Sequence, residues 1–198
     1  MEQEHSVRFG PPPRHRVVGR PIDRWRREVG DFDTWLIEHL DDLGRCLDLA
    51  RLEFAGRQVA VGQQYDSVDG EDVCVGWSQI DIDAQDEHGR RVIIEAQLGD
   101  SDHRHLGQLL HYAHTAKADV AVWVAASRTV EHAFLREHLE ILTDLNDRYR
   151  GERLFCAVEA RLESPWTLVS DPDATPVPCL HRIDLTGGPG GFRFTDDR

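Results

Sequence analysis

The feature that most constrains this chain is a pair of apolar segments within residues 78–98 that carry carboxylates at alternate positions. A polar turn ending in His88-Gly89 separates the two segments, and this pattern predicts a β-hairpin. Asp81 lies in the first segment and Glu95 in the second, each between apolar neighbours. A carboxylate in an otherwise apolar strand is costly unless it is paired or bound to a cation. The hairpin therefore predicts a metal site.

Strand geometry brings further polar side chains to this site. Successive side chains of a strand point to opposite faces, so Glu95 and Gln97 share one face, as Asp81 and Asp83 do. Oxygens of Asp81 and Glu95, with a backbone carbonyl and water, form the hard site that Mg²⁺ or Mn²⁺ prefers. We expect Gln97 to position a water or touch a phosphate oxygen, and Asp83 to lie at the surface or behind the ligands.

The rest of the pattern predicts an α/β fold with a mixed sheet flanked by helices. The expected elements are a helix over 31–43, a strand over 51–61, a protruding hairpin within 63–79, the central hairpin over 78–98, a helix over 103–116, a buried strand over 119–126, a helix over 130–149 and a strand over 153–162. In this α-β-β-β-α-β-α-β order, hairpins favour antiparallel pairing of the early strands, while a helical crossover favours parallel pairing later.

The length of 198 residues fits one domain with a full hydrophobic core. We expect a basic, proline-containing arm over 1–28, the folded domain over 29–163, and a Pro/Gly-rich extension over 164–198 with one short strand around 181–185. Seven arginines lie between Arg8 and Arg27. Contact of this arm with phosphates is one hypothesis, and a solubilising or interdomain role is the other.

Composition excludes several classes of protein. The net charge of −13 argues against broad non-specific attraction to nucleic acid. No apolar run approaches the ~20 residues needed to span a bilayer, and the start shows no secretory signal, so we expect a cytoplasmic protein with no membrane partner.

The four cysteines form no C-x-x-C pair and are interpreted as reduced thiols. No G-x-x-x-x-G-K-[ST] loop occurs, so no nucleotide cofactor is expected.

A cluster of histidines raises a zinc alternative. The four residues are His103, His105, His111 and His114. Only the last two share a helical face, and no Cys or His pair follows at a zinc-finger interval. Solvated or DNA-facing histidines are therefore the preferred interpretation. Trp35 and Trp123 are expected in the core.

Two motifs in the centre of the chain resemble those of a known superfamily. Asp81 followed by Glu95-Ala96-Gln97 resembles the PD-(D/E)xK nuclease signature, in the variant where glutamine replaces lysine. Gln108-Leu-Leu-His-Tyr112 resembles the Q-x-x-x-Y motif of RecB-type members, and its two end residues project from one helical face. The run over 94–113 is similar to a bacterial family of small PD-(D/E)xK proteins.

A third motif lies upstream. Phe32-Asp33-x-Trp35-Leu36 resembles the first-helix motif of NucS-like endonucleases, in which an acidic residue completes the site. Asp33 is the candidate for that residue, with Glu38 as its rival. The resemblance covers roughly residues 31–162.

The resemblance implies a restriction-endonuclease-like core and metal-dependent hydrolysis of DNA, as an endonuclease in defence, repair or recombination. Asp81 and Glu95 would ligate Mg²⁺ or Mn²⁺, with the Ala96 carbonyl as a third protein ligand. Gln108 and Tyr112 would orient the site or contact DNA. The metal would lower the pKa of a bound water and stabilise charge on the phosphate. Such nucleases often form homodimers to cut both strands, although the sequence does not indicate a homodimer interface.

The position of the usual lysine holds Gln97, which supplies no positive charge to a transition state. Together with the net charge of −13, this substitution motivates an alternative function. In the alternative, the chain is a catalytically weak or inactive nuclease-fold module that binds protein or nucleic acid.

Overall fold

The computed structural model describes residues 15–49, 51–68, 71–165, 176–188 and 191–194. Its strands are β1 (His15–Gly19), β2 (Leu52–Val68), β3 (Glu71–Asp86), β4 (Arg91–Gln97), β5 (Val120–Ala125), β6 (Leu154–Pro165), β7 (Val177–Gly188) and β8 (Gly191–Phe194). Its helices are α1 (Pro21–Arg24), a π-helical turn (Glu28–Phe32), α2 (Asp33–Glu38), α3 (Leu40–Cys46), α4 (His103–Thr115) and α5 (Arg136–Arg148).

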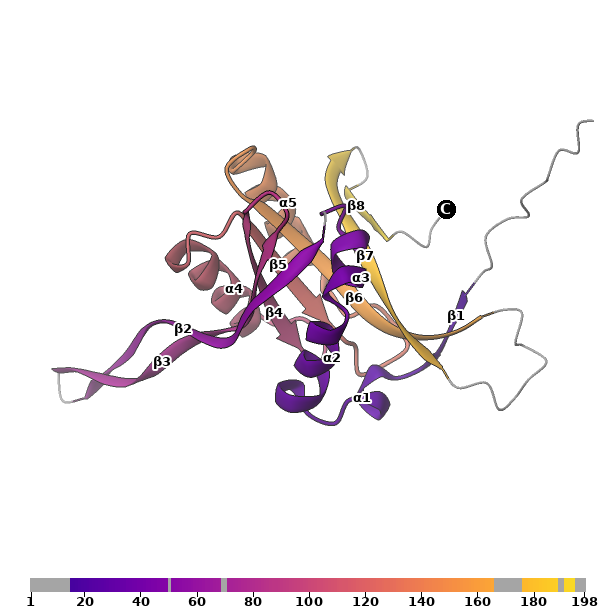
Figure 1. Cartoon of the computed structure of the whole chain (residues 1–198), viewed down its shortest axis with the longest axis horizontal. Helices are drawn as coiled ribbons and strands as arrows, with labels where there is room; N and C mark the ends of the chain where they lie inside the picture. Colours follow the sequence, from indigo (N-terminus) through magenta and orange to yellow (C-terminus); the bar gives the residue numbers. More distant parts are fainter. Residues whose placement is uncertain (1–14, 50, 69–70, 166–175, 189–190, 195–198) are drawn as a thin grey trace, which may run out of the picture.

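The described strands form one mixed sheet in the order β2-β3-β4-β5-β6-β7-β8, with β1 pairing β6 (Figure 1). The β2–β3 and β3–β4 pairs are antiparallel because tight turns connect them. The β4–β5 and β5–β6 pairs are parallel because α4 and α5 form their crossovers. These findings confirm the expected α/β class and mixed sheet.

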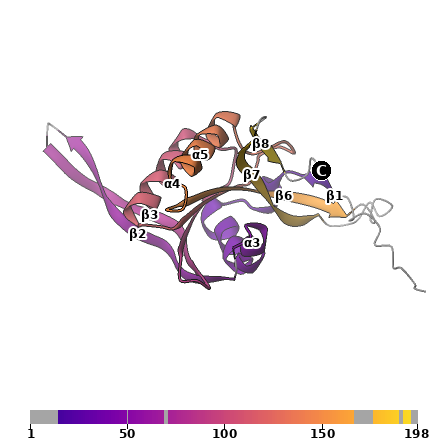
Figure 2. The same ribbon diagram turned by 90° about the horizontal axis from the view of Figure 1, so that it is seen from above.

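Helices cover both faces of the sheet, as Figure 2 shows, with α4 and α5 on one side and α3 on the other. The uninterrupted apolar run of β5 supplies both layers of the core. Val122 and Val124 belong to the cluster that contains α2 and α3, whereas Ala121 and Trp123 belong to the cluster of α4 and α5. The expected strand buried on both faces is therefore confirmed.

The central hairpin is also confirmed. Ile82 pairs with Ile94, and Gly89 occupies the turn with φ of +77°, a conformation that favours glycine. Asp86 closes the turn, because its Oδ1 accepts hydrogen bonds from the backbone N–H groups of His88 and Arg90.

Two predicted helices differ from the structure. The helix expected over 31–43 is interrupted at His39, whose φ and ψ are −117° and 26°. The His39 ring hydrogen-bonds the Trp35 carbonyl oxygen at 2.8 Å, a local bond of the kind that competes with regular helix geometry.

The helix expected over 130–149 begins only at Arg136. Side chains bind the preceding backbone instead. The Ala133 N–H donates to Glu159 Oε1 at 2.7 Å, and the Leu135 N–H donates to Ser101 Oγ at 2.8 Å. These partners lie far away in sequence, which is why helical periodicity alone misplaces the start.

The sheet extends beyond residues 29–163 at both ends. β1 pairs β6, and Trp25 is buried beside Phe32 and Trp35 with ring centroids 4.8 Å from each. β7 pairs β6 and contains the strand expected around 181–185, but it is longer than that prediction. Arg8 and Arg14 of the basic arm lie outside the described residues.

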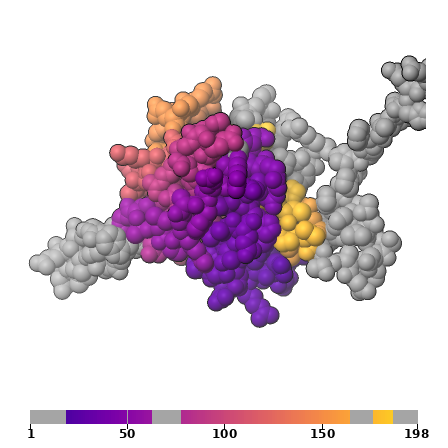
Figure 3. Space-filling view, in the orientation of Figure 1, coloured from indigo at the N-terminus to yellow at the C-terminus, as the bar shows by residue number. Residues whose placement is uncertain are grey.

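The β2–β3 ribbon projects well beyond the helices (Figure 1), as the hairpin prediction indicated. Its predicted turn at Asp69-Gly70 lies outside the described residues. The opposite end of the ribbon lies beside α3 (Figure 2), and the N-terminal part of the chain forms the middle of the face in Figure 3. Among the described helices, none is long and apolar enough to cross a bilayer.

Candidate metal centre

The candidate site lies where β3 and β4 separate. Their paired register ends at Ile82 and Ile94, so the N–H groups of Ala96 and Leu98 on that edge need other partners. The Ala96 N–H donates to Asp81 Oδ2 at 2.9 Å, and the Leu98 N–H donates to Glu28 Oε2 at 2.8 Å. Two carboxylates are thus anchored to the backbone around Glu95.

Glu95 itself points to the α4 side of the sheet and is only 3% exposed. Its buried Oε2 has no hydrogen-bond partner among the described residues. Burial, followed by the charges of Asp81 and Glu28, raises the pKa of Glu95 to about 9. A carboxyl held in this way keeps its proton at neutral pH unless a cation replaces the proton.

Asp81 is held by a distorted segment of β2. Gln58 stands opposite it with φ of +49°, a left-handed conformation that costs roughly 1–2 kcal/mol in a non-glycine residue. The Gln58 Nε2 donates to Asp81 Oδ1 at 2.9 Å. Burial raises the pKa of Asp81, and the negative charge of Glu28 raises it further. The hydrogen bonds from Gln58 and from the Ala96 N–H act in the opposite direction but are outweighed. The strained residue therefore positions a carboxylate within the acidic cluster.

Glu28 is a site residue that the sequence did not reveal. Burial acts to raise its pKa, but His105 and the Leu98 N–H reverse the effect and lower it below the usual value. His105 Nε2 lies 3.9 Å from Glu28 Oε1, and its Nδ1 hydrogen-bonds Asp102 Oδ1 at 2.9 Å. No local pattern marks Glu28, because only the tertiary fold brings it to the end of β4.

The structure gives Asp33 a different set of partners. It is 1% exposed, accepts hydrogen bonds from the backbone of Gly30 and Thr34, and forms an ion pair with Arg57 at 2.7 Å. Asp33 thus links α2 to β2, although its charge contributes to the raised pKa of Asp81. Its predicted rival, Glu38, is exposed.

The Gln97 side chain hydrogen-bonds residues next to the site, and no bond to Asp81, Glu95 or Glu28 is among them. Its Nε2 donates to the Asp100 carbonyl at 2.6 Å and to Asp102 Oδ2 at 3.0 Å. Its Oε1 accepts the Trp123 indole N–H at 3.1 Å. Both ends of this buried amide are therefore engaged in holding α4 and β5 to the end of β4.

Gln108 and Tyr112 project from one face of α4, as predicted, and the Gln108 Nε2 donates to the Tyr112 hydroxyl at 3.1 Å. Burial raises the pKa of Tyr112, and the charges of Glu95 and Asp81 raise it further. This face of α4 is therefore turned toward the carboxylate cluster. Asp83 lies apart from the cluster in an ion pair with Arg91 at 2.6 Å.

A second group of ligand-type residues lies between the N-terminal turns of α4 and α5. It consists of His103, Glu137 and His138. His138 is fully buried, and its two ring nitrogens hydrogen-bond His103 Nδ1 and Ser101 Oγ, both at 2.8 Å. Burial and the neighbouring His103 lower the pKa of His138. These hydrogen bonds account for the group without a metal.

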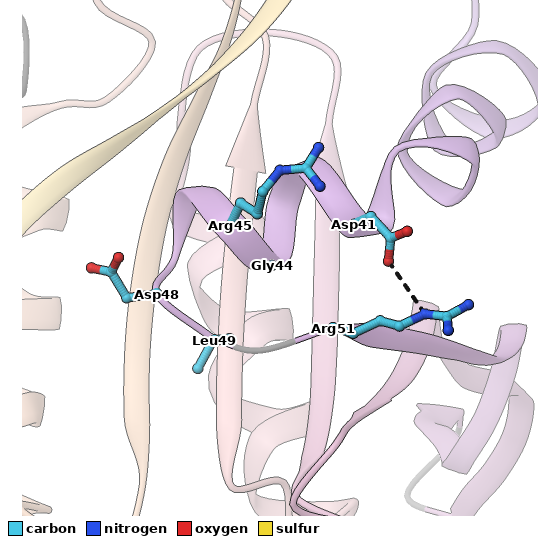
Figure 4. Close-up of a pocket in the computed structure, with 6 residues that line it drawn as sticks. All are labelled: Asp41, Gly44, Arg45, Asp48, Leu49 and Arg51. Atoms are coloured by element: carbon cyan, nitrogen blue, oxygen red, sulfur yellow. Dashed lines mark ion pairs between the residues drawn. The ribbon is translucent and has the colours of Figure 1, made fainter.

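An open depression in the described surface lies elsewhere, between α3 and the start of β2 (Figure 4). It is open, has a volume of about 580 Å³, and is lined mainly by charged side chains. Arg51 and Asp41 form an exposed ion pair across it at 3.7 Å. It contains none of the carboxylates described above, and its charged side chains form exposed ion pairs, such as that of Asp48 with Arg182 at 3.0 Å.

Comparison with known proteins does not indicate a function for this chain. No protein-family model matches this chain, and neither a curated protein nor a solved structure matches it. The function must therefore be argued from the three carboxylates and the groups that surround them.

Proposed function

We propose that this chain is a metal-dependent nuclease of the PD-(D/E)xK type that hydrolyses DNA phosphodiesters. The observation that carries the proposal is the buried Glu95 Oε2, which has no hydrogen-bond partner among the described residues and lies beside two other carboxylates. An isolated acidic cluster of this kind is unfavourable in the metal-free protein. A divalent cation would remove that cost.

The order of elements supports the same proposal. Asp81 lies on β3, Glu95 lies on the adjacent β4, and Gln108 with Tyr112 follows on α4. This arrangement agrees with the order that the resemblance implies for a restriction-endonuclease-like core. The fold alone does not determine the reaction, so the proposal depends on the site.

The available donors suit Mg²⁺ or Mn²⁺. Asp81, Glu95 and Glu28 offer only carboxylate oxygens, and each oxygen keeps a free lone pair when it accepts one hydrogen bond. The N–H and C=O of a strand residue point to the same edge, so the Ala96 carbonyl faces the same side as its N–H, which binds Asp81. Neither cysteine nor histidine is needed in this set, which disfavours zinc.

The bound cation would supply a water of lowered pKa and offset negative charge on the phosphate. The residues of the chain would prepare the site for it. Gln58 and the Ala96 N–H hold Asp81, while His105 and the Leu98 N–H hold Glu28 in its ionised form. Tyr112 and Gln108 cover the α4 side and would orient the phosphate or the water.

The test is cleavage of labelled duplex, single-stranded and branched DNA by the purified full-length chain in Mg²⁺ or Mn²⁺. We expect cleavage of at least one substrate, complete loss in EDTA, and a loss of at least ~100-fold in Glu95→Gln. Glu87→Gln, an exposed glutamate in the β3–β4 turn, is the matched control and should cut normally. A panel left uncut with both metals would contradict the proposal.

One observation favours a second function. Because the Gln97 amide is fully engaged with Asp100, Asp102 and Trp123, the lysine-equivalent position contributes no cation. A nuclease-fold module that binds protein or nucleic acid without cutting would have this property. Calorimetry distinguishes the two functions: the module predicts no Mn²⁺ binding that depends on Glu95, whereas the nuclease predicts binding that Glu95→Gln abolishes.

A further inference from the structure

The site lacks a lysine on β4, but α4 carries a cation beside it. Arg104 lies one helical turn before Gln108, which lies one turn before Tyr112, so the three residues form a row along one face. The Arg104 Nε donates to Gln108 Oε1 at 3.3 Å, and the Gln108 Nε2 donates to the Tyr112 hydroxyl. The row is therefore connected from its exposed end to its buried end.

This row faces the carboxylates. Tyr112 at its buried end is affected by the charges of Glu95 and Asp81, as described above. At its exposed end, the charge of Arg104 acts to lower the pKa values of Glu95 and Glu28, against the larger effect of burial on both groups. Arg104 thus lies within the electrostatic field of the cluster.

The other cations near the site are already paired. Arg57 forms an ion pair with Asp33, and His105 is bound between Asp102 and Glu28. In the described part of the chain, the Arg104 side chain forms no ion pair, and Nε is the one of its three nitrogens with a hydrogen bond. Its two terminal nitrogens are therefore available to a ligand on the exposed side of α4.

We propose that Arg104 is a catalytic residue that binds the non-bridging oxygens of the scissile phosphate and supplies the positive charge that Gln97 does not. This assignment rests on the proposed nuclease function. A guanidinium presents two parallel N–H donors that match two phosphate oxygens. It also remains protonated, so it stabilises charge and accepts no proton from the attacking water.

The hydrolysis balances with this division of roles. The water oxygen forms a bond to phosphorus, one P–O ester bond breaks, and the proton lost by the water reaches the leaving oxygen through solvent. Arg104 contacts oxygens that gain charge during the attack and neither gains nor loses a proton. The Gln108 contact keeps the flexible arginine side chain on the correct face of α4.

The test compares DNA cleavage rates of wild type, Arg104→Ala, Arg104→Lys and Arg136→Ala, with Mn²⁺ affinity measured by calorimetry on each. Arg136 is the matched control because it is exposed at the start of α5 and pairs with Glu140. We expect Arg104→Ala to lower kcat at least ~100-fold, with Mn²⁺ bound as tightly as in wild type or more tightly. Arg104→Lys should recover roughly tenfold of the loss, and added guanidinium ion should partly restore Arg104→Ala.

The outcomes separate the two proposals. Wild type that cuts DNA, together with Arg104→Ala that cuts equally well, overturns the Arg104 assignment and leaves the nuclease function standing. Loss of activity without rescue by lysine or guanidinium also overturns it, since a purely structural arginine would behave in that way. Wild type that cuts no DNA overturns the nuclease function and the Arg104 assignment with it.

Discussion

At the scale of single residues, the raised pKa of Glu95 predicts that stability depends on pH and that the proposed metal competes with a proton. Its pKa of about 9 in the folded state lies above the ordinary value of 4.5, so the folded chain binds this proton more tightly than the unfolded chain does. The stabilising effect of the proton is complete below about pH 4.5 and is lost as the pH rises through 9. Metal binding at neutral pH must displace this proton.

Glu95→Gln should therefore stabilise the metal-free protein in a pH-dependent way. At pH 8 we expect a gain of about 1 kcal/mol or more, which corresponds to a thermal midpoint higher by ~2–4 °C. The gain should disappear below pH 4.5, where the wild-type carboxyl becomes protonated in the unfolded chain as well as in the folded one. Thermal unfolding in EDTA at several pH values checks this. A constant difference across that range would show that Glu95 titrates normally.

Gln97 should behave as a structural residue. Gln97→Leu leaves the buried Trp123 N–H without its acceptor and removes the donor to Asp102 Oδ2 and the Asp100 carbonyl, so we expect a loss of about 2–3 kcal/mol in the free energy of unfolding. Denaturant unfolding measures the loss. Gln79→Leu, at an exposed glutamine on β3, is the control and should change stability by less than ~0.5 kcal/mol. Equal effects of the two substitutions would contradict this role.

At the scale of elements, α2 and the preceding π-helical turn place two acidic residues with different tasks. Asp33 holds the backbone of Gly30 and Thr34 and binds Arg57, whereas Glu28 reaches the end of β4. We expect Asp33→Asn to cost about 2 kcal/mol in stability, because the buried carboxylate loses its charge-assisted hydrogen bond and ion pair with Arg57. Its Mn²⁺ affinity should change less than about threefold.

Glu28→Gln is the companion to that prediction. It removes a charge from the cluster but leaves the α2–β2 ion pair intact, so Mn²⁺ affinity should fall at least ~10-fold with a smaller change in stability. Calorimetry and denaturant unfolding of both variants give the comparison. If Asp33→Asn weakens Mn²⁺ binding more than Glu28→Gln does, Asp33 is the third carboxylate of the site.

The elements that sequence predicted well are those fixed by local chemistry. The β3–β4 turn requires a residue with positive φ, which Gly89 supplies, and the apolar run of β5 requires burial on both faces. The helix begins only at Arg136 because Glu159 and Ser101 capture the backbone before it. Hydrogen bonds between residues far apart in sequence do not change the spacing of apolar residues, so periodicity cannot predict them. Glu28 was missed because its bond to the Leu98 N–H is also of this kind.

At the scale of the whole molecule, the net charge of −13 opposes DNA binding, and the carboxylate cluster concentrates negative charge near the proposed phosphate site. Divalent cations should therefore raise DNA affinity by more than their screening of charge repulsion accounts for. We expect at least ~10-fold weaker binding in EDTA than in Ca²⁺ at matched ionic strength. Fluorescence anisotropy with a labelled duplex measures this, and Glu95→Gln should lose the difference. Equal affinities in both buffers would count against a metal-bridged complex.

Sequence and structure contribute different parts of the site. The resemblance identified Asp81, Glu95, Gln108 and Tyr112, and these residues converge around the separation of β3 and β4. It did not identify Glu28, which reaches the site only through tertiary packing, or Arg104, which precedes Gln108 by one turn of the same helix but belongs to neither motif. The amide of Gln97, assigned to water or phosphate on strand parity, is instead engaged by Asp102 and Trp123.

The most direct test of the central claim is the anomalous difference density of a crystal soaked in Mn²⁺. The account predicts a peak bounded by Asp81 and Glu95, with Glu28 near it, and no such peak in Glu95→Gln crystals. A soaked crystal with no peak there, or with manganese only at His103, Glu137 and His138, would contradict the proposed metal centre.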